Sequence, residues 1–293
     1  FNMNQAETEL ILNPDRSVYH LHLRDEHIAD NVILVGDPGR VELISSFFDS
    51  MDCEISNREF TTHTGSYKGT RISAISTGIG TDNIDIVVNE LDAAINIDPD
   101  TKQPKEQLRK LNLIRLGTCG ALQEDLIIDS LLITECSLGI DGVRHFYNLE
   151  SSPFEKAIET AFISQCNWKL PLNRPYAKMA SSALLKQFDG LGQKGITVAA
   201  NGFFGPQGRF LRIPLRNEDI NAQLTGFRFK NLRIVNYEME SSALYALGHA
   251  LGHNTICICV IIGNRLAGKF SKNYHPAVNK LVKATLDKCR DND

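Results

Sequence analysis

The chain has 293 residues, a formal net charge of -4, 42% hydrophobic residues and 23% charged residues. These values are typical of a folded globular protein and exclude the compositions of disordered and fibrous proteins. The length allows one or two domains, and we expect one. Because the sequence has no run of basic residues, it offers no electrostatic surface for a nucleic acid or an anionic membrane.

The sequence also predicts a cytoplasmic protein. Its longest apolar run, 255–263, is far shorter than the ~20 residues that cross a bilayer. Residues 1–15 lack the apolar core of a signal peptide. Seven cysteines occur without a Cys-x-x-Cys pair, as in reduced proteins. Cys257 and Cys259 alternate in a strand-like run, so we expect both thiols to point to one side and pack there.

Predicted strands and helices alternate along the chain. A β-branched run at 31–35 ends in the turn 36–40, where Asp37 suits the cap of a helix and Pro38 its first position, and apolar residues at helical spacing follow at 41–48. The same order recurs as strand 71–76, turn 77–81 and helix 82–95. Further strands are predicted at 112–116, 131–134, 196–200, 234–236 and 255–262, and helices at 153–166, 239–251 and 277–288. This alternation predicts an α/β layer architecture with a largely parallel sheet and ligands at the carboxyl ends of its strands.

Two segments lie outside this alternation. We expect residues 1–17 to be an N-terminal extension. Segment 96–110 contains two prolines and many charged residues, which predicts a surface insertion with a short helix rather than a linker between domains.

Two arginines are candidate anion ligands. Arg40 follows a strand-turn-helix whose free N–H groups suit phosphate, although an ordinary connection with Arg40 in solvent is more common for such a segment alone. Arg115 interrupts an apolar strand that ends in Gly117-Thr118-Cys119-Gly120. A buried guanidinium needs a partner, because an isolated buried charge is very costly. That partner is either an internal carboxylate or a bound anion, and the residues leave both open.

Two other segments allow both a structural and a functional interpretation. Glu238 and Glu240 precede an apolar helix, where carboxylates either cap the helix or accept hydrogen bonds from the vicinal hydroxyls of a sugar. The loop 203–209 either holds a buried aromatic anchor or clamps a planar base. In the second case Phe203 stacks on the base, and Gln207 and Arg209 donate to its carbonyl groups.

Taken in order, these segments are similar to motifs of the nucleoside phosphorylases of the uridine phosphorylase type, from about Val18 to the last predicted helix. The motifs that carry the resemblance are Tyr19-His20-Leu21, Gly36-Asp37-Pro38-Gly39-Arg40, Arg58-Glu59-Phe60-Thr61-Thr62, Ser76-Thr77-Gly78-Ile79-Gly80, Arg115-Leu116-Gly117-Thr118, Gln207-Gly208-Arg209, 236–241 and Asn264-Arg265. The resemblance implies one three-layer domain over residues 1–293, with a central mixed, largely parallel twisted sheet between helices.

The resemblance also implies a role for particular residues. The implied phosphate ligands are Gly36, Arg40, Arg115 and Thr118, with Arg58 from a neighbouring subunit. The implied ribose ligands are Met239 and Glu240, with the neighbour's His20 at the 5′-hydroxyl, and the implied base ligands are Phe203, Gln207 and Arg209. Arg115, Gln207, Arg209 and Glu240 are the expected catalytic residues.

The implied reaction is the reversible phosphorolysis of uridine to uracil and ribose 1-phosphate, with deoxyuridine and thymidine as further candidate substrates. Orthophosphate is the co-substrate and no cofactor is required. A monovalent cation at Glu59, Ile79 and Asn83 is a further implication, as is self-assembly into a dimer or a trimer of dimers.

Two alternatives remain, a purine nucleoside phosphorylase and a non-catalytic nucleoside-binding protein. Asn264 disfavours the first, because the purine branch of the family places there an Asp that donates a proton to the base. The sequence departs from the family pattern at Asn201-Gly202 and at Gly205-Pro206, beside the predicted base site.

Overall fold

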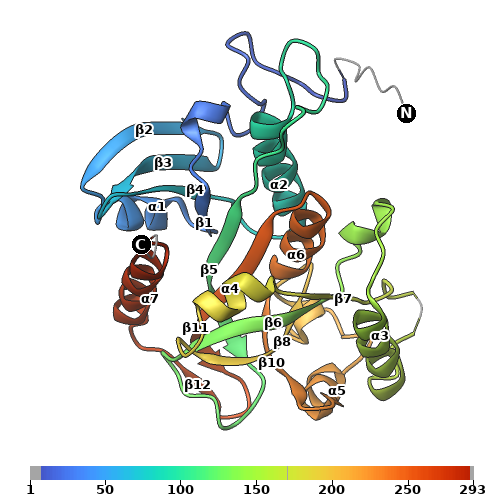
Figure 1. Cartoon of the computed structure of the whole chain (residues 1–293). Coiled ribbons are helices and arrows are strands. Elements are labelled where there is room, and N and C mark those ends of the chain that lie inside the picture. The colour runs from blue at the N-terminus through green and yellow to red at the C-terminus, as the bar shows by residue number, and fades with distance from the viewer. Residues whose placement is uncertain (1–7, 170, 291–293) are drawn as a thin grey trace.

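The computed structural model describes residues 8–169 and 171–290. Residues 1–7 of the predicted N-terminal extension therefore lie outside the described residues. The strands are β1 (Asn31–Val35), β2 (Ser50–Asn57), β3 (Phe60–Tyr67), β4 (Thr70–Ser76), β5 (Asn112–Ala121), β6 (Leu131–Gly139), β7 (Tyr176–Met179), β8 (Gln193–Ala199), β9 (Arg228–Phe229), β10 (Leu232–Glu238), β11 (Asn254–Asn264) and β12 (Lys269–Phe270). The α-helices are α1 (Pro38–Ser45), α2 (Thr81–Asn96), α3 (Pro153–Gln165), α4 (Ser182–Gln187), α5 (Ile220–Gly226), α6 (Ser241–Ala250) and α7 (His275–Lys288), and the 3-10 helices are η1 (Asp25–His27), η2 (Val143–Phe146) and η3 (Gly205–Gln207) (Figure 1).

The strands form a mixed sheet in the order β12-β11-β6-β8-β10-β5-β1-β4-β3-β2, with β7 beside β6 and β9 beside β10. The central strand β5 pairs in parallel with both β1 and β11. Because β11 also pairs with β6, and β6, β8 and β10 lead back to β5, these five strands form a closed ring. The predicted mixed sheet is confirmed, with parallel pairing in β1–β4, β1–β5, β5–β11, β6–β8 and β8–β10 and antiparallel pairing in the other pairs of described strands. The ring is a feature that the sequence pattern did not indicate.

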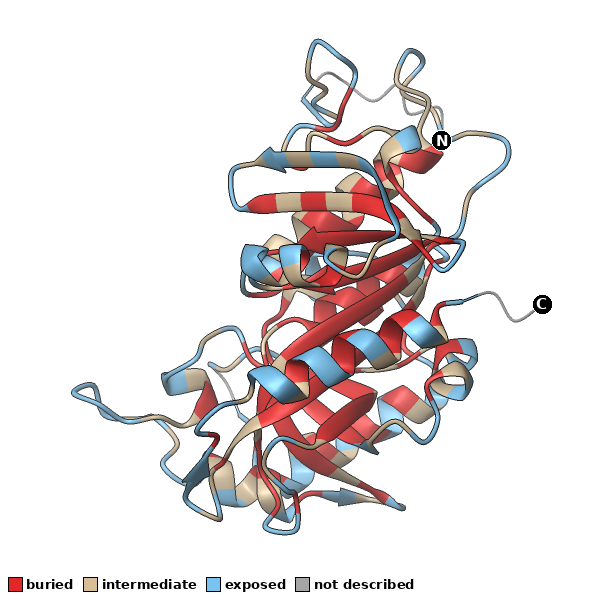
Figure 2. Cartoon of the chain, turned by 90° about the vertical axis from the view of Figure 1, so that its left-hand side faces the viewer, coloured by how far each residue is buried: buried red, intermediate tan, exposed pale blue. Residues whose placement is uncertain are grey.

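Helices cover both faces of the sheet and make the three predicted layers. Along β1, Val32 and Leu34 pack into the cluster that contains α2 and α6, whereas Ile33 and Val35 pack into the cluster that contains α1 and α7. A strand buried on both faces is continuously apolar, which explains the unbroken run in β1. Figure 2 shows that most strands are buried, whereas the helices that cover them have exposed outer faces.

The strands and helices predicted from continuous apolar runs are present, with shifted ends. Strand 31–35 is confirmed to the residue as β1. Helix α1 begins at Pro38, the predicted first position, and ends at Ser45 rather than at 48. The Asp37 side chain accepts a hydrogen bond from Gly39 N at 3.0 Å, which confirms the predicted cap. The hairpin β2–β3 was not predicted, because β2 is largely exposed and β3 buries the hydroxyls of Thr62 and Thr64. Alternating polar strands give a weaker signal than buried parallel ones.

The short helix expected within segment 96–110 is wrong. After α2 ends at Asn96, the described residues up to β5 contain only turns and a bridge between Ile97 and Pro104. The reason is local: the Asp98 carboxylate accepts hydrogen bonds from Asp100 N and Thr101 N, at 3.0 and 2.8 Å, and closes a turn instead.

Ion pairs join this segment to the chain before β1. Lys105 Nζ lies 2.8 Å from Asp25 Oδ2, Arg109 Nη1 lies 2.6 Å from Asp25 Oδ1, and Arg109 Nε lies 2.7 Å from Asp30 Oδ1. The segment is therefore held against the domain by charge rather than by an apolar helix face.

No helix of the described residues is long and apolar enough to cross a membrane. The thiols of Cys257 and Cys259 lie 3.8 Å apart in the buried core, which confirms that both point to the same side of β11.

Side-chain hydrogen bonds join the amino ends of three parallel strands, at the opposite edge from their carboxyl ends. Asn112 Nδ2 donates to Asn31 Oδ1 at 2.9 Å, and Asn112 Oδ1 accepts from Asn254 Nδ2 at 2.8 Å. Asn112→Ala removes both bonds, so we expect the free energy of unfolding to fall by about 1–3 kcal/mol, as measured by urea denaturation. The control is Asn148→Ala in an exposed loop, which should leave stability unchanged. An equal effect of both variants would contradict this assignment.

Candidate active site

A cavity of about 740 Å³ opens where β5 changes its neighbour. On one edge β5 pairs with β1 as far as Leu116 and with β10 only from Gly120 onward. Residues 117–119 between them have no strand partner on that edge among the described residues. The carboxyl ends of β1 and β10 therefore meet at this gap, and such switch points are where α/β sheets bind ligands.

The cavity brings together most of the residues predicted to form a site. Its lining includes Gly36, Arg40, Thr118 and Arg115 of the predicted phosphate set, Met239 and Glu240 of the ribose set, and Phe203, Gln207 and Arg209 of the base set. Segments from four separate parts of the chain thus face one space.

Arg40 and Arg115 give one end of this cavity its positive charge. The half-buried Arg40 donates from Nη1 to Leu116 O at 3.3 Å, a carbonyl of the central strand. Burial and then the neighbouring charge of Arg115 lower the pKa of the Arg40 guanidinium below its ordinary value. Two guanidiniums this close repel one another, and an anion between them would remove the repulsion.

Arg115 has an internal carboxylate as its partner. The side chain is 5% exposed, and its Nη2 donates a short hydrogen bond to Glu240 Oε2. Its Nη1 lies 3.9 Å from Glu238 Oε2, and its buried Nε has no partner among the described residues. A Cβ on Gly117 would lie 2.2 Å from Arg115 Nη1, so only glycine leaves room for this guanidinium. Of the two partners that the sequence left open, the internal carboxylate is present, and Arg115 Nε remains as a donor that no described residue uses.

The two carboxylates before α6 differ in role: one caps the helix, and the other faces the cavity. Glu238 accepts hydrogen bonds from Glu240 N at 2.9 Å and from Ser241 N and Oγ at 2.9 and 2.6 Å, so it caps the helix. Glu240 turns instead toward Arg115, and its Oε1 accepts from Gly80 N at 2.9 Å at the start of α2. The helix predicted from 239 begins at Ser241 for this reason. The Glu240 carboxylate is thus held by Arg115 and by Gly80 N while it lines the cavity.

The loop after β8 is not built on a buried aromatic anchor. Phe203 is 51% exposed, and the Arg209 guanidinium lies 3.7 Å from its ring centre. Arg209 Nη1 also donates to Gln207 Oε1 at 2.6 Å, while Gln207 is buried. No described residue accepts a hydrogen bond from Gln207 Nε2, so this donor is free for a ligand. Burial and the neighbouring Arg265 lower the pKa of Arg209 to about 10.

The family resemblance assigned no site role to Arg265 or Glu238, although both line the cavity. Arg265 Nη1 donates to Gln207 O at 2.6 Å and so fixes the loop that carries Gln207. Its position directly after Asn264, at the end of a strongly predicted strand, was the available signal. The sequence identified Glu238 as one of two carboxylates before the helix. Its role as the helix cap depends on the exact residue at which the helix begins.

Asn264 lines the cavity, but its side-chain amide is engaged in hydrogen bonds to the backbone. The side chain is 2% exposed, and its Nδ2 donates to Gln123 O and Leu126 O at 2.9 and 2.8 Å. Its Oδ1 accepts from Ala267 N at 3.1 Å. The amide therefore has no proton to give to a departing base.

His20 and Arg58 lie together, away from the cavity lining of their own chain. The Arg58 guanidinium lies 5.3 Å from the ring centre of Tyr19, the neighbour of His20. The His20 ring contacts Glu90 Oε1 at 2.6 Å, and Asn57 Nδ2, from the residue before Arg58, donates to His20 O at 2.8 Å. The structure therefore forms one surface from the two residues expected to act on a neighbouring subunit.

The three residues suggested for a monovalent cation are only partly together. A Cβ built on Gly78 would lie 2.2 Å from Asn83 Nδ2 and 3.5 Å from Glu59 Cγ, so these two side chains meet at Gly78. Ile79 is 70% exposed and lines the cavity instead.

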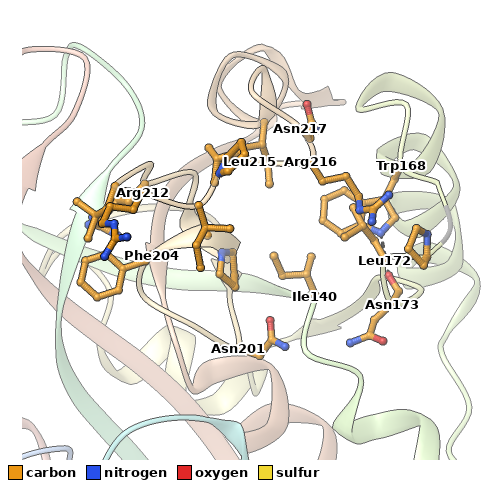
Figure 3. A pocket seen from close by; sticks show the side chains of 18 residues that line it. Ile140, Trp168, Leu172, Asn173, Asn201, Phe204, Arg212, Leu215, Arg216 and Asn217 are labelled. Carbon is orange, nitrogen blue, oxygen red and sulfur yellow. Dashed lines mark hydrogen bonds between the residues drawn. The ribbon is translucent and has the colours of Figure 1, made fainter.

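A second and larger cavity, of about 1030 Å³, lies on the other side of the loop 203–209. Figure 3 shows Phe204 and Leu215 facing Trp168 and Leu172 across its open centre, with Ile140 and Asn201 below. Arg209 lines both cavities. None of the predicted phosphate or ribose residues lines this second space.

The fold and the first cavity define an α/β protein with two neighbouring arginines and a polar, arginine-containing loop at one switch point of its sheet. The sequence model of the phosphorylase superfamily matches residues 30–290. The chain belongs to this superfamily.

Relatives and solved structures agree with this family. The chain is 30% identical over 263 residues to a uridine phosphorylase of Thermococcus kodakarensis, covering 87% of this chain and 80% of the relative. It is 29% identical over 252 residues to a DeoD-type purine nucleoside phosphorylase of Alkaliphilus metalliredigens, covering 85% and 88%. A nucleoside phosphorylase of Trypanosoma brucei, whose crystal structure is described as showing uridine phosphorylase activity, superimposes with a TM-score of 0.86 at 28% identity, covering 96% and 98%.

Glu238 should make stability depend on pH. Burial, with a smaller contribution from the Glu240 charge, outweighs Arg115 and raises the pKa of Glu238 from 4.5 to about 7. The folded state therefore holds a proton that the unfolded state has released, so the contribution of Glu238 is full below pH 4.5 and is lost as pH rises through about 7. Glu238→Gln should remove this decline, as measured by urea denaturation across that window. Parallel stability curves for the two proteins would contradict the prediction.

Proposed function

We propose that the chain is a uridine phosphorylase, which converts uridine and orthophosphate to uracil and ribose 1-phosphate and also runs in reverse. The observation that carries this proposal is the convergence of Arg40 and Arg115, Glu240, and the Gln207–Arg209 pair in one cavity. These groups match an anion, a sugar and a base with carbonyl groups. The similarity to uridine phosphorylases of two organisms supports the same substrates.

Phosphate is assigned to the end of the cavity beside Gly36, Arg40, Arg115 and Thr118. The free donors of Arg115 and the mutual repulsion of the two guanidiniums support an anion there. Phosphate at this position would lie beside the ribose carbon from which the base departs, because Glu240 connects the two subsites through Arg115.

Ribose and uracil occupy the rest of the cavity. Glu240 keeps lone pairs for the ribose hydroxyls while Arg115 and Gly80 N hold its orientation, and Met239 covers the sugar. Gln207 Nε2 and the Arg209 guanidinium donate to the uracil carbonyls, and Phe203 stacks on the ring. Asn264 has no proton to donate, which favours uracil over a purine leaving group.

The reaction needs no covalent bond to the protein. A phosphate oxygen attacks C1′ of the ribose as the C1′–N1 bond breaks, and the bonding electron pair leaves with uracil. Positive charge grows on the sugar and is stabilised by the phosphate beneath it. Negative charge spreads onto the base oxygens, where Gln207 and Arg209 donate, and uracil then takes a proton from water. The chain acts by holding these groups in place.

We also propose an oligomeric assembly and a cellular location for this protein. The neighbouring surface formed by His20 and Arg58 supports a dimer, or a trimer of dimers, in which each chain gives these two residues to the other's site. A monovalent cation beside Glu59 and Asn83 and a cytoplasmic location complete the proposal.

The substrate prediction is tested by incubating the protein with uridine, thymidine, inosine and adenosine, each with and without phosphate, while base release is followed. We expect uracil release that depends on phosphate, because the cavity binds an anion rather than an activated water. Uracil release without phosphate would contradict phosphorolysis, purine release alone would favour the purine alternative, and binding without turnover would favour the non-catalytic one.

Sharing of sites between subunits is tested by co-expressing two inactive chains. Arg40→Ala disables the chain's own cavity, whereas Arg58→Ala disables the residue given to the partner. Random pairing makes half the dimers mixed, and each mixed dimer has one site with both arginines, so we expect about a quarter of the wild-type activity. The control is each variant expressed alone, and recovery no greater than the sum of these would show that Arg58 acts within its own chain.

A further inference from the structure

The second cavity is built at the carboxyl ends of two parallel ring strands. Ile140 directly follows β6, and Asn201 lies two residues after β8, and both line its floor. The walls include Trp168 and the segments 171–173 and 211–217. This position, beside but separate from the switch point at β5, is a second place where an α/β sheet can hold a ligand.

Apolar side chains dominate this lining and leave a large surface open to solvent. Leu172, Leu215 and Ile220 line the inside, and Leu211 and Ile213 at its rim are 68% and 83% exposed. Contiguous exposed apolar surface of this kind marks a binding site on a folded protein. The occupant must therefore have a substantial apolar part.

The charged residues in the lining indicate that a ligand of this cavity carries an anionic group. Arg212 and Arg216 line the cavity, and neither makes an ion pair or hydrogen bond within the described residues. No Asp or Glu is among the described lining residues. Asn201, Gly205 and Pro206, where this sequence departs from the family pattern, also line it. An apolar space with two unpaired guanidiniums complements an apolar molecule that carries an anionic group.

The cavity shares a wall with the proposed uracil subsite. Arg209 lines both spaces, and Phe204 on one side contacts Phe203 on the other with ring centres 5.3 Å apart. A ligand that packs against Phe204 would therefore hold the loop that carries Gln207 and Arg209. Occupancy of one cavity should change the affinity of the other.

We propose that this second cavity binds an alkyl carboxylate, with its chain between Trp168 and Leu215 and its carboxylate at Arg212 or Arg216. This inference goes beyond the proposed reaction, because none of the phosphate or ribose residues takes part.

Trp168 supplies a direct measurement. It is the only tryptophan of the chain and lines the cavity, and its Nε1 donates to Asn173 O at 2.8 Å, which fixes the ring. Decanoate, below its micelle concentration, should change Trp168 emission saturably in the whole protein. 1-Decanol has the same chain without the charge, so it should bind at least ~10-fold more weakly, because it gains no charge-assisted hydrogen bond.

The variants test the two guanidiniums. Arg212→Gln with Arg216→Gln should reduce decanoate binding to the level of 1-decanol and leave 1-decanol unchanged. Arg174→Gln is the matched control, because Arg174 is exposed near Trp168 but does not line the cavity. Decanoate should also change the KM for uridine in wild type by ~2-fold or more, but not in the double variant, as coupled sites require.

Several outcomes would overturn the proposal. Equal binding of decanoate and 1-decanol would remove the role of the arginines, and an emission unaffected by decanoate would remove the site. An emission that shifts with protein concentration alone would mean that a second copy covers the cavity. A response to phosphatidylglycerol vesicles but not to decanoate would assign the patch to a membrane surface. Because emission is read without turnover, failure of the proposed reaction leaves this test intact.

Discussion

The buried ion pair between Arg115 and Glu240 is the interaction on which the cavity depends. It joins the middle of β5 to the segment between β10 and α6, and Gly80 N adds the start of α2 to the same carboxylate. Such pairs contribute little net stability, because desolvation of both charges offsets their attraction, but loss of one partner typically costs about 3–5 kcal/mol. The pair is therefore better understood as a constraint on geometry: it fixes one guanidinium and one carboxylate at the edge of a cavity before any ligand arrives.

The sheet makes this constraint possible. A uniform parallel sheet would pair both edges of β5 along their whole length and leave no room beside residues 117–119. Here β5 leaves β1 and meets β10, which approaches from the opposite direction. Closure of the ring through β11, β6 and β8 holds β10 in that place. The cavity is thus a consequence of how five strands close on themselves, and Gly117 then supplies the space for the arginine.

The parts of the fold that depend on local pattern could be predicted from the sequence, and the parts that depend on distant partners could not. β1, β4 and α2 follow from apolar runs punctuated by glycine turns, and the structure agrees to within one residue at each end. β2 was not predicted because its own residues lack a strand pattern, and it forms a strand only by pairing with β3. Likewise, the sequence identified Arg115 and two carboxylates as candidates. Whether a carboxylate or an anion is the partner of Arg115 depends on a contact between residues 125 positions apart.

The dependence on distant partners also explains why the net charge says little about the ligands of this chain. Its slight acidity excludes a polyanion, yet the charges are not evenly distributed. The first cavity is lined by four arginines, one lysine and three carboxylates, so a bound anion meets a positive charge that is only partly neutralised. In the second, arginines line an apolar space without any described carboxylate. A single loop, 203–209, separates the two environments and contributes Arg209 to both. A ligand that restricts this loop from the second cavity also changes how Gln207 and Arg209 are presented in the first. The proposed coupling of the two cavities therefore acts through this common wall.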